Sequence, residues 1–197
     1  MRSLYRSKKV DGLVAEISHE EKAIPVMQKF LKEVIVSSEI GLVVEIGTAT
    51  GGWTLLAHEV EPNITILTFD IESIADSKKR QRVTPRQAIA VQRHLDKTDR
   101  VQRFIGNCFS GCNCQILNTV LKLSFAKLLY CDGGDKKREM LEFGPLLNSG
   151  DILGVHDWVT DVSHSDKIQS FLLPFRPLPI NSEFVSAGGS SRFFMKR

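Results

Sequence analysis

The stretch Leu42-Val-Val-Glu-Ile-Gly-Thr-Ala-Thr-Gly-Gly-Trp53 decides the fold. Its first five residues form a short apolar run with β-branched members, which is typical of a buried strand. Glycines follow at positions 47, 51 and 52, and they permit a tight turn at the end of that strand. A helix is expected next, from Gly52 to Glu61. The stretch therefore predicts one βα unit.

The same alternation continues along the chain. Further strands are expected at residues 65–69, 101–105, 126–131 and 152–155. Helices are expected between them: one that Thr84 caps and Pro85 begins, with Gln87 closing a capping box, one around 116–121, one at 136–147 and one near 167–172. Five βα units imply a parallel sheet with helices on both faces, which is a Rossmann-like three-layer α/β sandwich.

Both ends of the chain add to this pattern. Apolar residues spaced i, i+3, i+4, i+7 and i+8 predict a helix before the first strand: Met27, Phe30, Leu31, Val34 and Ile35. Its start is ambiguous, because Ser18 and Glu21 suit a capping box whereas Pro25 suits a first turn. Two β-rich segments, 183–187 and 192–195, flank Gly188-Gly-Ser-Ser191 and predict an antiparallel hairpin at the C-terminus.

Length and composition predict one domain over residues 1–197. The chain is 42% apolar and 25% charged, and its apolar runs are shorter than the ~20 residues that cross a bilayer. The basic start, without an apolar run after it, is unlike a secretory signal, so we expect a cytoplasmic protein without a membrane partner. Residues 1–20 are expected to form a solvated, flexible arm. The spacing Cys-x3-Cys-x-Cys from Cys108 to Cys114 does not suit zinc, and buried thiols are the alternative that we favour.

Positive charge is concentrated in one segment. The net charge is only +3, but nine basic residues against two acidic ones lie between Lys78 and Arg103. Such a run can attract nucleic acid or an anionic substrate. The alternative is a solvated helix face, and no aromatic residue in the run could stack on bases.

Ligands of open α/β sheets bind beyond the carboxyl ends of the strands, so residues at these ends are the candidates for the site. Glu45 and the glycines Gly47 and Gly51 are the strongest signal. Their spacing, G-x-x-x-G-G, differs from the G-x-G-x-x-G of pyrophosphate-binding loops, and an acid two residues before the first glycine favours a cationic ligand. The alternative is an ordinary glycine-rich turn.

A second acid follows the second expected strand. Asp70 lies 25 residues after Glu45, where doubly wound folds place the carboxylate that binds ribose hydroxyls. Asn107, after the third strand, could reach an adenine edge. Both residues are also common in turns and caps. Together with Glu45, Asp70 favours adenosine binding, and we expect further ligand contacts from Thr48, Ala49, Trp53 and Ile71.

The fourth and fifth strands end in acidic residues. Asp132 follows one, and His156-Asp157 follows the other. Two carboxylates suit a hard divalent cation such as Mg²⁺, which would lower the pKa of a substrate hydroxyl and hold it in line with its reaction partner. His156 could instead act as a general base. A third alternative makes one carboxylate a helix cap and the other a turn residue.

These motifs resemble the class I S-adenosylmethionine-dependent methyltransferases. The resemblance rests on Glu45-x-Gly47-x-x-x-Gly51, Asp70, Asp132-Gly-Gly and the segment from Pro145 to Trp158. It is strongest to small O-methyltransferases of the cephalosporin-hydroxylase and catechol-methyltransferase type. It implies a seven-stranded sheet with a reversed last strand, Glu45 and Gly47 beside the methionine moiety, Asp70 on the ribose, and Asp132 and Asp157 at the metal positions.

The sequence also departs from that family. Asp135 stands where relatives often have histidine, and Trp158 stands where the catechol type has the asparagine that completes its metal site. Both departures weaken the metal-dependent interpretation, and Lys136 or His156 would then supply the base. The leading hypothesis is methyl transfer to a small-molecule hydroxyl, with a homodimer as a further expectation. The alternatives are an RNA methyltransferase, a catalytically silent cofactor-binding module, and a dehydrogenase, which the glycine spacing disfavours.

Overall fold

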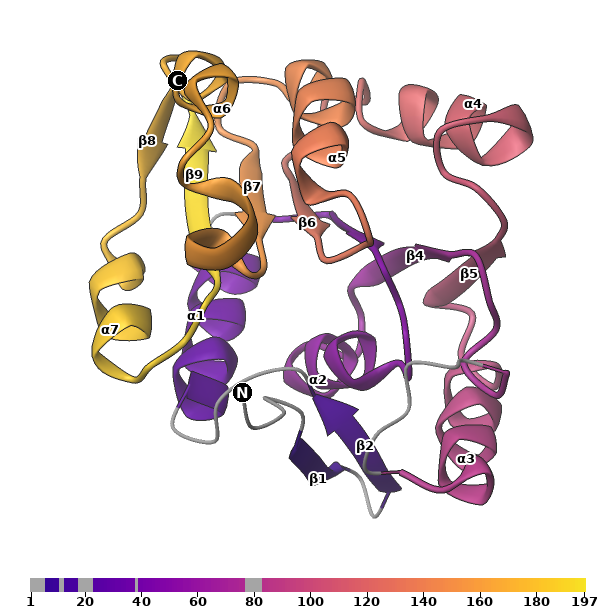
Figure 1. Ribbon diagram of the computed structural model, residues 1–197. Helices are drawn as coiled ribbons and strands as arrows, with labels where there is room; N and C mark the ends of the chain where they lie inside the picture. Colours follow the sequence, from indigo (N-terminus) through magenta and orange to yellow (C-terminus); the bar gives the residue numbers. More distant parts are fainter. Residues whose placement is uncertain (1–5, 11–12, 18–22, 38, 77–82) are drawn as a thin grey trace.

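The computed structural model describes residues 6–10, 13–17, 23–37, 39–76 and 83–197. Its centre is a seven-stranded sheet in the order β5-β4-β3-β6-β7-β9-β8 (Figure 1). The strands are β3 (Leu42–Ile46), β4 (Thr65–Asp70), β5 (Val101–Ile105), β6 (Lys127–Cys131), β7 (Ile152–Val155), β8 (Phe175–Pro177) and β9 (Arg192–Lys196). Strands β3 to β7 are parallel to one another, and β9 is antiparallel to both β7 and β8.

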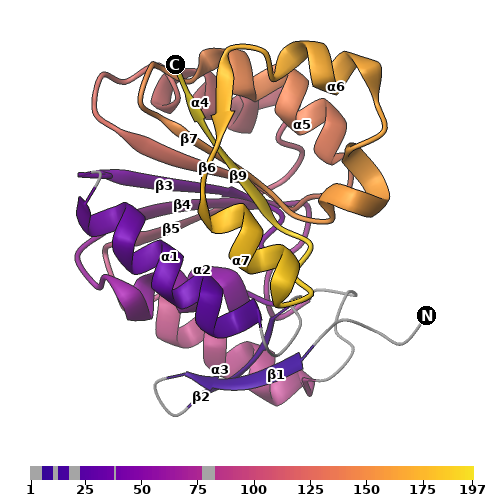
Figure 2. The same ribbon diagram turned by 90° about the vertical axis from the view of Figure 1, so that its left-hand side faces the viewer.

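Helices cover both faces of this sheet, so the molecule has three layers (Figure 2). One layer holds α1 (Ala23–Ser37), α2 (Gly52–Val60), α3 (Pro85–Leu95) and α7 (Ile180–Ser186). The other holds α4 (Gly111–Val120), α5 (Lys136–Phe143) and α6 (Asp166–Phe171). Two apolar clusters fill the spaces between the layers, one on each face of the sheet. The predicted Rossmann-like fold class is therefore confirmed.

Local sequence signals account for several element boundaries. The hydroxyl of Thr84 accepts the N–H of Gln87, and the Gln87 side chain accepts the N–H of Thr84, so the predicted capping box begins α3 at Pro85. Helix α1 begins at Ala23, which places Pro25 in its first turn, and Ser18 and Glu21 lie outside the described residues. Helix α5 ends at Phe143, earlier than predicted, and continues as a 3₁₀ turn over Gly144–Leu146.

The predicted C-terminal hairpin needs a correction. Residues 183–187 were expected to be a strand, but they belong mostly to α7, which buries Ile180 and Phe184 one turn apart. The antiparallel partner of β9 is β8, and α7 lies in the connection between them. The sequence of α7 contains Phe and Val, which favour strands, but packing against α1 and β9 decides the outcome.

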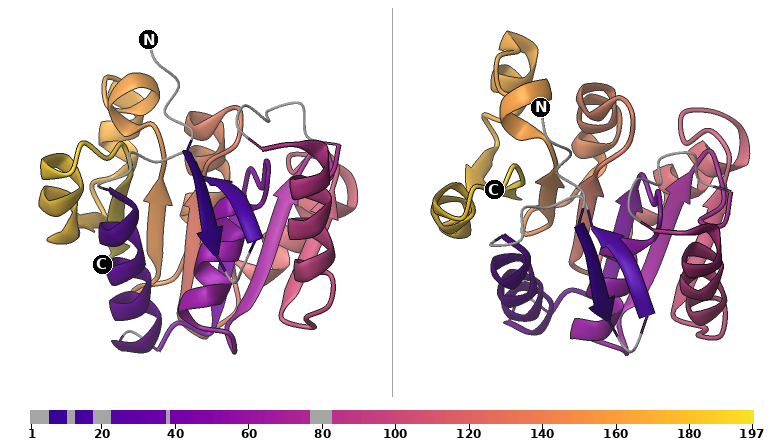
Figure 3. Two further views of the ribbon diagram at one scale, coloured as in Figure 1. Left: turned by 90° about the horizontal axis from the view of Figure 1, so that it is seen from below. Right: turned by 60° about the horizontal axis from the view of Figure 1, so that its bottom comes forward.

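The N-terminal segment is also different from the prediction. Within the expected flexible arm, β1 (Arg6–Val10) and β2 (Leu13–Ile17) pair as an antiparallel hairpin. Strand β2 contacts α2 and α3, so the hairpin lies against the outside of that helix layer (Figure 3). Among the described residues, no helix is both long and apolar enough to cross a membrane.

Candidate functional site

The glycine loop after β3 approaches the backbone of the neighbouring strand end. Gly47 has a φ of +98°, and a Cβ atom there would lie 2.4 Å from the backbone carbon and oxygen of Asp132. Its N–H donates to the carbonyl of Phe69 at 2.8 Å. Gly51, with a φ of +77°, is the N-cap of α2. Both positions therefore need glycine. The backbone of this loop lies at the carboxyl ends of β3 and β6.

Glu45 lies under this loop and is 1% exposed. Its Oε2 accepts hydrogen bonds from the hydroxyls of Thr54 and Thr68. Its Oε1 has no hydrogen-bond partner among the described residues. Burial raises the pKa of Glu45 to about 8, although the two threonine donors oppose that shift. A buried acceptor without a partner is unfavourable, so this carboxyl group is suited to accept a hydrogen bond from a bound ligand.

Trp53 provides a second buried polar atom of this kind. Its indole is 5% exposed and stacks on Tyr130 with ring centroids 4.4 Å apart. The Nε1–H has no acceptor within the described part of the chain. The segment from Glu45 to Trp53 thus holds one orphaned acceptor and one orphaned donor. A ligand that carries both an ammonium and a carboxylate group has the chemistry to pair with them.

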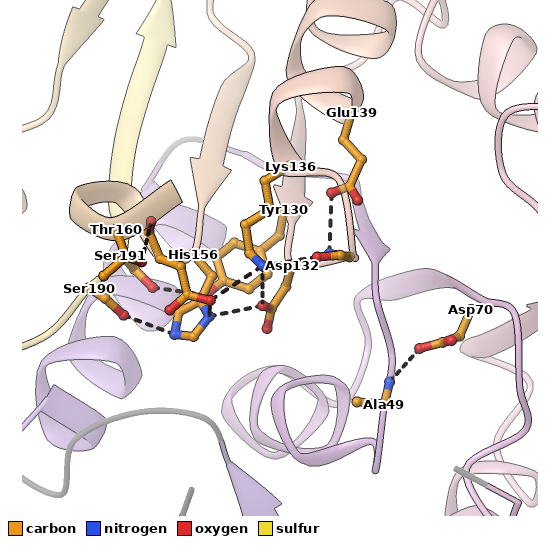
Figure 4. Close-up of polar contacts among 12 residues, drawn as sticks. Ala49, Asp70, Tyr130, Asp132, Lys136, Glu139, His156, Thr160, Ser190 and Ser191 are labelled. Atoms are coloured by element: carbon orange, nitrogen blue, oxygen red, sulfur yellow. Dashed lines mark hydrogen bonds and ion pairs between the residues drawn. The ribbon is translucent and has the colours of Figure 1, made fainter. Parts of the chain in front are cut away.

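Asp70 ends β4 beside the glycine loop. Its Oδ2 accepts the N–H of Ala49 at 2.7 Å, and its Oδ1 accepts the N–H of Glu72 at 3.3 Å (Figure 4). Ala49 has a φ of +47°, an uncommon conformation that this hydrogen bond helps to hold. Asp70 therefore fixes the shape of the loop, and its carboxylate also lines the cavity described next.

A cavity of about 370 Å³ opens at the carboxyl ends of the central strands. It is lined by Ile46, Gly47, Phe69, Asp70, Ile71, Gly106, Asn107, Cys108, Phe109, Gly133, Gly134, Asp135 and Glu139. Of the residues expected to bind a cofactor, Gly47, Asp70, Ile71 and Asn107 therefore lie on this wall. The others are outside the lining: Glu45, Thr48, Ala49, Gly51, Trp53 and Asp132.

The structure gives two of the expected residues a local role. Thr48 is buried, and its hydroxyl pairs with that of Thr68, which joins it to the hydrogen-bond network of Glu45. Asn107 Oδ1 accepts the N–H of Phe109 at 2.8 Å, so this side chain forms a turn at the rim of the cavity. The turn explanation that the sequence left open for Asn107 thus holds, while its amide stays on the cavity wall.

Sequence reasoning missed Glu139, a lining residue on α5. It is 1% exposed, and its Oε2 accepts the N–H of Gly133 at 3.2 Å. Burial raises its pKa to about 7. A signal was present, because Glu139 stands four residues before the inward Phe143 and so shares its buried face. An acid on the apolar face of a helix is unusual and points to a special role or partner.

Beside this cavity lies a compact charged cluster at the ends of β6 and β7. His156 is buried, with Nδ1 2.9 Å from Asp132 Oδ1 and 3.3 Å from Asp157 Oδ2. Its Nε2 lies 3.0 Å from the hydroxyl of Ser190. The ammonium of Lys136 lies 3.3 Å from Asp157 Oδ2 and donates to the carbonyl of Gly133 at 2.9 Å. Figure 4 shows Asp132, Lys136, His156 and Ser190 close together. Ser190 was not among the predicted residues.

The charged side chains of this cluster shift one another's pKa values. Burial opposes the charged imidazole, but the carboxylates of Asp132 and Asp157 raise the pKa of His156 to about 10. Burial also acts against Lys136, and the same carboxylates raise its pKa. His156 and Lys136 lower the pKa of Asp157 in return, more than burial raises it. An imidazole that is charged at neutral pH cannot accept a proton, so the charge of His156 argues against the general-base role considered for it.

Within the described residues, this cluster also holds three side chains of the types that ligate metals: Asp132, His156 and Asp157. Their ligand atoms lie within 4.8 Å of one another. However, the ammonium of Lys136 approaches the same carboxylates, and both nitrogens of His156 already face other groups. These residues therefore fit a divalent cation poorly. The cysteines form no such group in the described part of the chain, and all four are free thiols. The expectation of buried thiols holds for Cys108 and Cys131 but is wrong for Cys112, which is exposed, and for Cys114, which is half-buried.

A second, polar hollow of about 380 Å³ adjoins the cluster. It is lined by Gly134, Asp135, Lys136, Lys137 and Thr160. Gly134 and Asp135 line both this hollow and the first cavity, so one turn of backbone is shared by the two. Asp135 is the N-cap of α5, and its side chain accepts the N–H of Arg138 at 3.1 Å.

Comparisons with known proteins place this fold. No protein-family profile and no curated protein matches the chain. Among solved structures, a candidate caffeoyl-CoA O-methyltransferase from Staphylococcus aureus is 15% identical, with a TM-score of 0.54 over 87% of this chain and 83% of its own. A candidate methyltransferase from Thermobifida fusca is 12% identical, with a TM-score of 0.55 and coverages of 89% and 80%. A DUF574 family protein from Streptomyces avermitilis is 10% identical, with a TM-score of 0.58 and coverages of 91% and 84%. At these identities the likeness establishes the fold, which is the predicted one.

Proposed function

We propose that this protein is an S-adenosylmethionine-dependent methyltransferase that acts on a hydroxyl group of a small molecule. The observation that carries the proposal is the cavity of about 370 Å³ beside the glycine loop, with Asp70 and Ile71 on its wall. Ligands of open α/β sheets bind at this place. Two of the structural neighbours are named as candidate methyltransferases, one of them for O-methylation, which supports the same function.

Residues that line the cavity, together with two buried groups outside its lining, match the parts of the cofactor. Asp70 would bind the ribose hydroxyls, and Ile71 and Asn107 would contact the adenine. The orphaned Oε1 of Glu45 would accept from the cofactor's ammonium, and the orphaned Nε1–H of Trp53 would donate to its carboxylate. Gly47 lines the cavity and presents its backbone there without a side chain. The two buried polar atoms of Glu45 and Trp53, which have no partners among the described residues, would gain them from this ligand.

The charged cluster would position the methyl acceptor and accept its hydroxyl proton. The cofactor supplies a methyl group on a sulfonium, which is already activated, so the protein mainly has to position the acceptor. We place the acceptor hydroxyl in the polar hollow at Lys136, against Asp132. Asp132 then accepts the hydroxyl proton, and the ammonium of Lys136 stabilises the oxygen as negative charge develops. His156 holds Asp132 in place.

The described part of the basic run does not support nucleic acid as the acceptor. Of the basic run, residues 78–82 lie outside the described part of the chain. Arg103 pairs with Asp96 and Arg100 lies near Asp99, so part of the remaining charge is neutralised. We therefore do not propose an RNA methyltransferase, and a steep fall of RNA affinity with rising salt would be the result that restores that hypothesis.

Thermal unfolding with S-adenosylhomocysteine tests the cofactor, with NAD as the comparison ligand. A ligand at ~100 times its dissociation constant adds about 2.7 kcal/mol, which is a rise of several degrees in Tm for a chain of this size. Gly134→Leu is the matched variant, because its Cβ would meet open space while the position lines the cavity. We expect normal stability and no response to S-adenosylhomocysteine from this variant. A wild-type protein that does not respond, or that responds to NAD instead, contradicts the proposal.

Turnover needs a separate measurement. Release of S-adenosylhomocysteine is followed with a panel of phenols, sugars and hydroxy acids as acceptors. Methylation of a hydroxyl compound supports the full proposal. Binding of S-adenosylhomocysteine with no turnover on the whole panel would instead support the catalytically silent module.

A further inference from the structure

Lys136 reaches the point where two acidic strand ends meet. As the first residue of α5, it is 9% exposed. Its Nζ lies 3.3 Å from Asp157 Oδ2 and 4.0 Å from Asp132 Oδ1. The carbonyl of Gly133, at 2.9 Å, accepts a hydrogen bond from it and fixes its position. A buried lysine is retained only where anionic groups compensate its desolvation, and both carboxylates do so here.

The imidazole of His156 completes the compensation from the other side. Its Nδ1 lies 2.9 Å from Asp132 Oδ1 and 3.3 Å from Asp157 Oδ2, so this nitrogen faces two carboxylates. Its Nε2 faces Ser190 Oγ at 3.0 Å. A histidine binds a metal through the lone pair of a ring nitrogen, and here both ring nitrogens already face other groups of the chain.

The ammonium of Lys136 already lies where a divalent cation would bind. It is 3.3 Å from Asp157 Oδ2 and 4.0 Å from Asp132 Oδ1. A divalent cation at these carboxylates would have to displace it, because like charges a few ångströms apart repel strongly at a partly buried site. Mg²⁺ binds through carboxylate and water oxygens, and here Asp132 Oδ1 and Asp157 Oδ2 already face the side chains of Lys136 and His156.

We propose that this site works without a divalent cation, and that the ammonium of Lys136 takes the place of the metal ion between Asp132 and Asp157. The use of that charge on an acceptor hydroxyl rests on the proposed function, but the exclusion of the metal does not. Lys136 is thus at once the cation of the site and the reason that a metal does not bind there.

The test is direct binding of Mn²⁺, followed by electron paramagnetic resonance and by calorimetry. Wild-type protein is compared with Lys136→Ala and Lys136→Met, and with Lys137→Ala as the matched control on the exposed neighbouring lysine. We expect no saturable Mn²⁺ site in the wild type or in Lys137→Ala. Removal of the Lys136 charge should raise Mn²⁺ affinity by about tenfold or more, in line with the loss of a charge about 4 Å away. Adding Asp157→Asn to Lys136→Ala should abolish the new site.

Two results would overturn the proposal. One is a stoichiometric Mn²⁺ site in the wild-type protein that disappears in Asp157→Asn. The other is a pair of folded Lys136 variants, as judged by circular dichroism, that still bind no Mn²⁺, because Lys136 would then not be what keeps the metal out. Neither result depends on S-adenosylhomocysteine binding, so failure of the proposed function would be seen separately. Methyl transfer that a chelator leaves unchanged would agree with the proposal.

Discussion

Nδ1 of His156 lies 2.9 Å from Oδ1 of Asp132, which joins the residues that follow two neighbouring parallel strands. The register of β6 and β7 brings this about. Cys131 pairs with Val155, so the next residue of each strand emerges at the same edge of the sheet. The N–H of His156 also donates to the carbonyl of Cys131 at 3.0 Å. The contact is therefore set by the backbone as much as by the side chains.

The first prediction concerns the titration of His156. Burial acts to lower its pKa, but Asp132 and Asp157 raise it to about 10 from 6.5. The folded protein therefore holds a proton that the unfolded chain loses above pH 6.5, and the resulting stability is full below 6.5 and declines as pH rises toward 10. ¹⁵N NMR should show a charged ring at pH 8, and Asp132→Asn should lower the midpoint. A midpoint near 6.5 in the wild-type protein would refute the ion pair.

The second prediction concerns the buried pair of Lys127 and Asp151, remote from the site. Their charged groups lie 2.7 Å apart, with 0% and 2% of the side chains exposed. Lys127→Met would leave the carboxylate buried without its cation and should lower the free energy of unfolding by about 3–5 kcal/mol. The control is Lys29→Met, which removes an exposed ion pair with Glu183 and should change stability by less than about 1 kcal/mol. Urea denaturation measures both, and equal effects would contradict the argument.

Sequence predicted most of the sheet because its signals are local. The run Leu42–Ile46 became β3 with the bounds expected, and α3 begins where Thr84 and Pro85 place it. The hairpin of β1 and β2 was missed although Asp11-Gly12, a dipeptide typical of two-residue hairpin turns, stands between the two strands in the sequence. The basic residues of that segment favour a solvated arm, whereas its turn dipeptide favours a hairpin. Helix α7 was missed because one of the elements it packs against, α1, is distant in sequence.

Only those residues of the candidate site that lie at the ends of strands could be predicted from the sequence. Gly47, Asp70, Asp132 and Asp157 could be found because the carboxyl ends of parallel strands share an edge. Ser190 could not, since only the return of the chain toward β9 brings its hydroxyl to His156. The contacts of Lys136 with Gly133 and Asp132 are local, three and four residues back in the sequence. Its contact with Asp157, like that of Ser190 with His156, is a tertiary relationship that no local spacing encodes.

The third prediction concerns Glu45 and pH. Burial raises its pKa from 4.5 to about 8, so the folded protein keeps a proton that the unfolded chain releases. Stability should therefore fall as pH rises from 4.5 to 8. Glu45→Gln removes the titrating group, and its free energy of unfolding should depend less on pH over that interval. Urea denaturation at pH 5, 6, 7 and 8 compares the two proteins. Identical pH profiles would mean that Glu45 ionises normally.

The fourth prediction uses the same residue for ligand binding. The cofactor's ammonium group beside Glu45 would favour the ionised carboxylate and so lower the raised pKa that Glu45 has in the ligand-free protein. The resulting charge-assisted hydrogen bond contributes about 1.5–3 kcal/mol. Glu45→Gln should therefore weaken S-adenosylhomocysteine by about tenfold or more in calorimetry. Glu183→Gln, which alters an exposed carboxylate on α7, is the control and should bind as the wild type does. Unchanged affinity in Glu45→Gln would show that the orphaned Oε1 does not face the cofactor.

The last prediction separates backbone strain from close contact at Gly47. Gly47 and Gly150 have φ values of +98° and +89°, so alanine is strained at both positions. A Cβ on Gly150 would meet nothing within 4 Å, whereas one on Gly47 would lie 2.4 Å from the backbone of Asp132. Gly150→Ala should therefore lose only about 1–2 kcal/mol. Gly47→Ala should lose clearly more, because the glycine loop has to move away from β6. It should also lose S-adenosylhomocysteine binding, while Gly150→Ala keeps it. If the two variants were equally stable and bound the ligand equally well, the loop would not be held against Asp132. The proposed binding of the cofactor by the backbone of the glycine loop would then be contradicted.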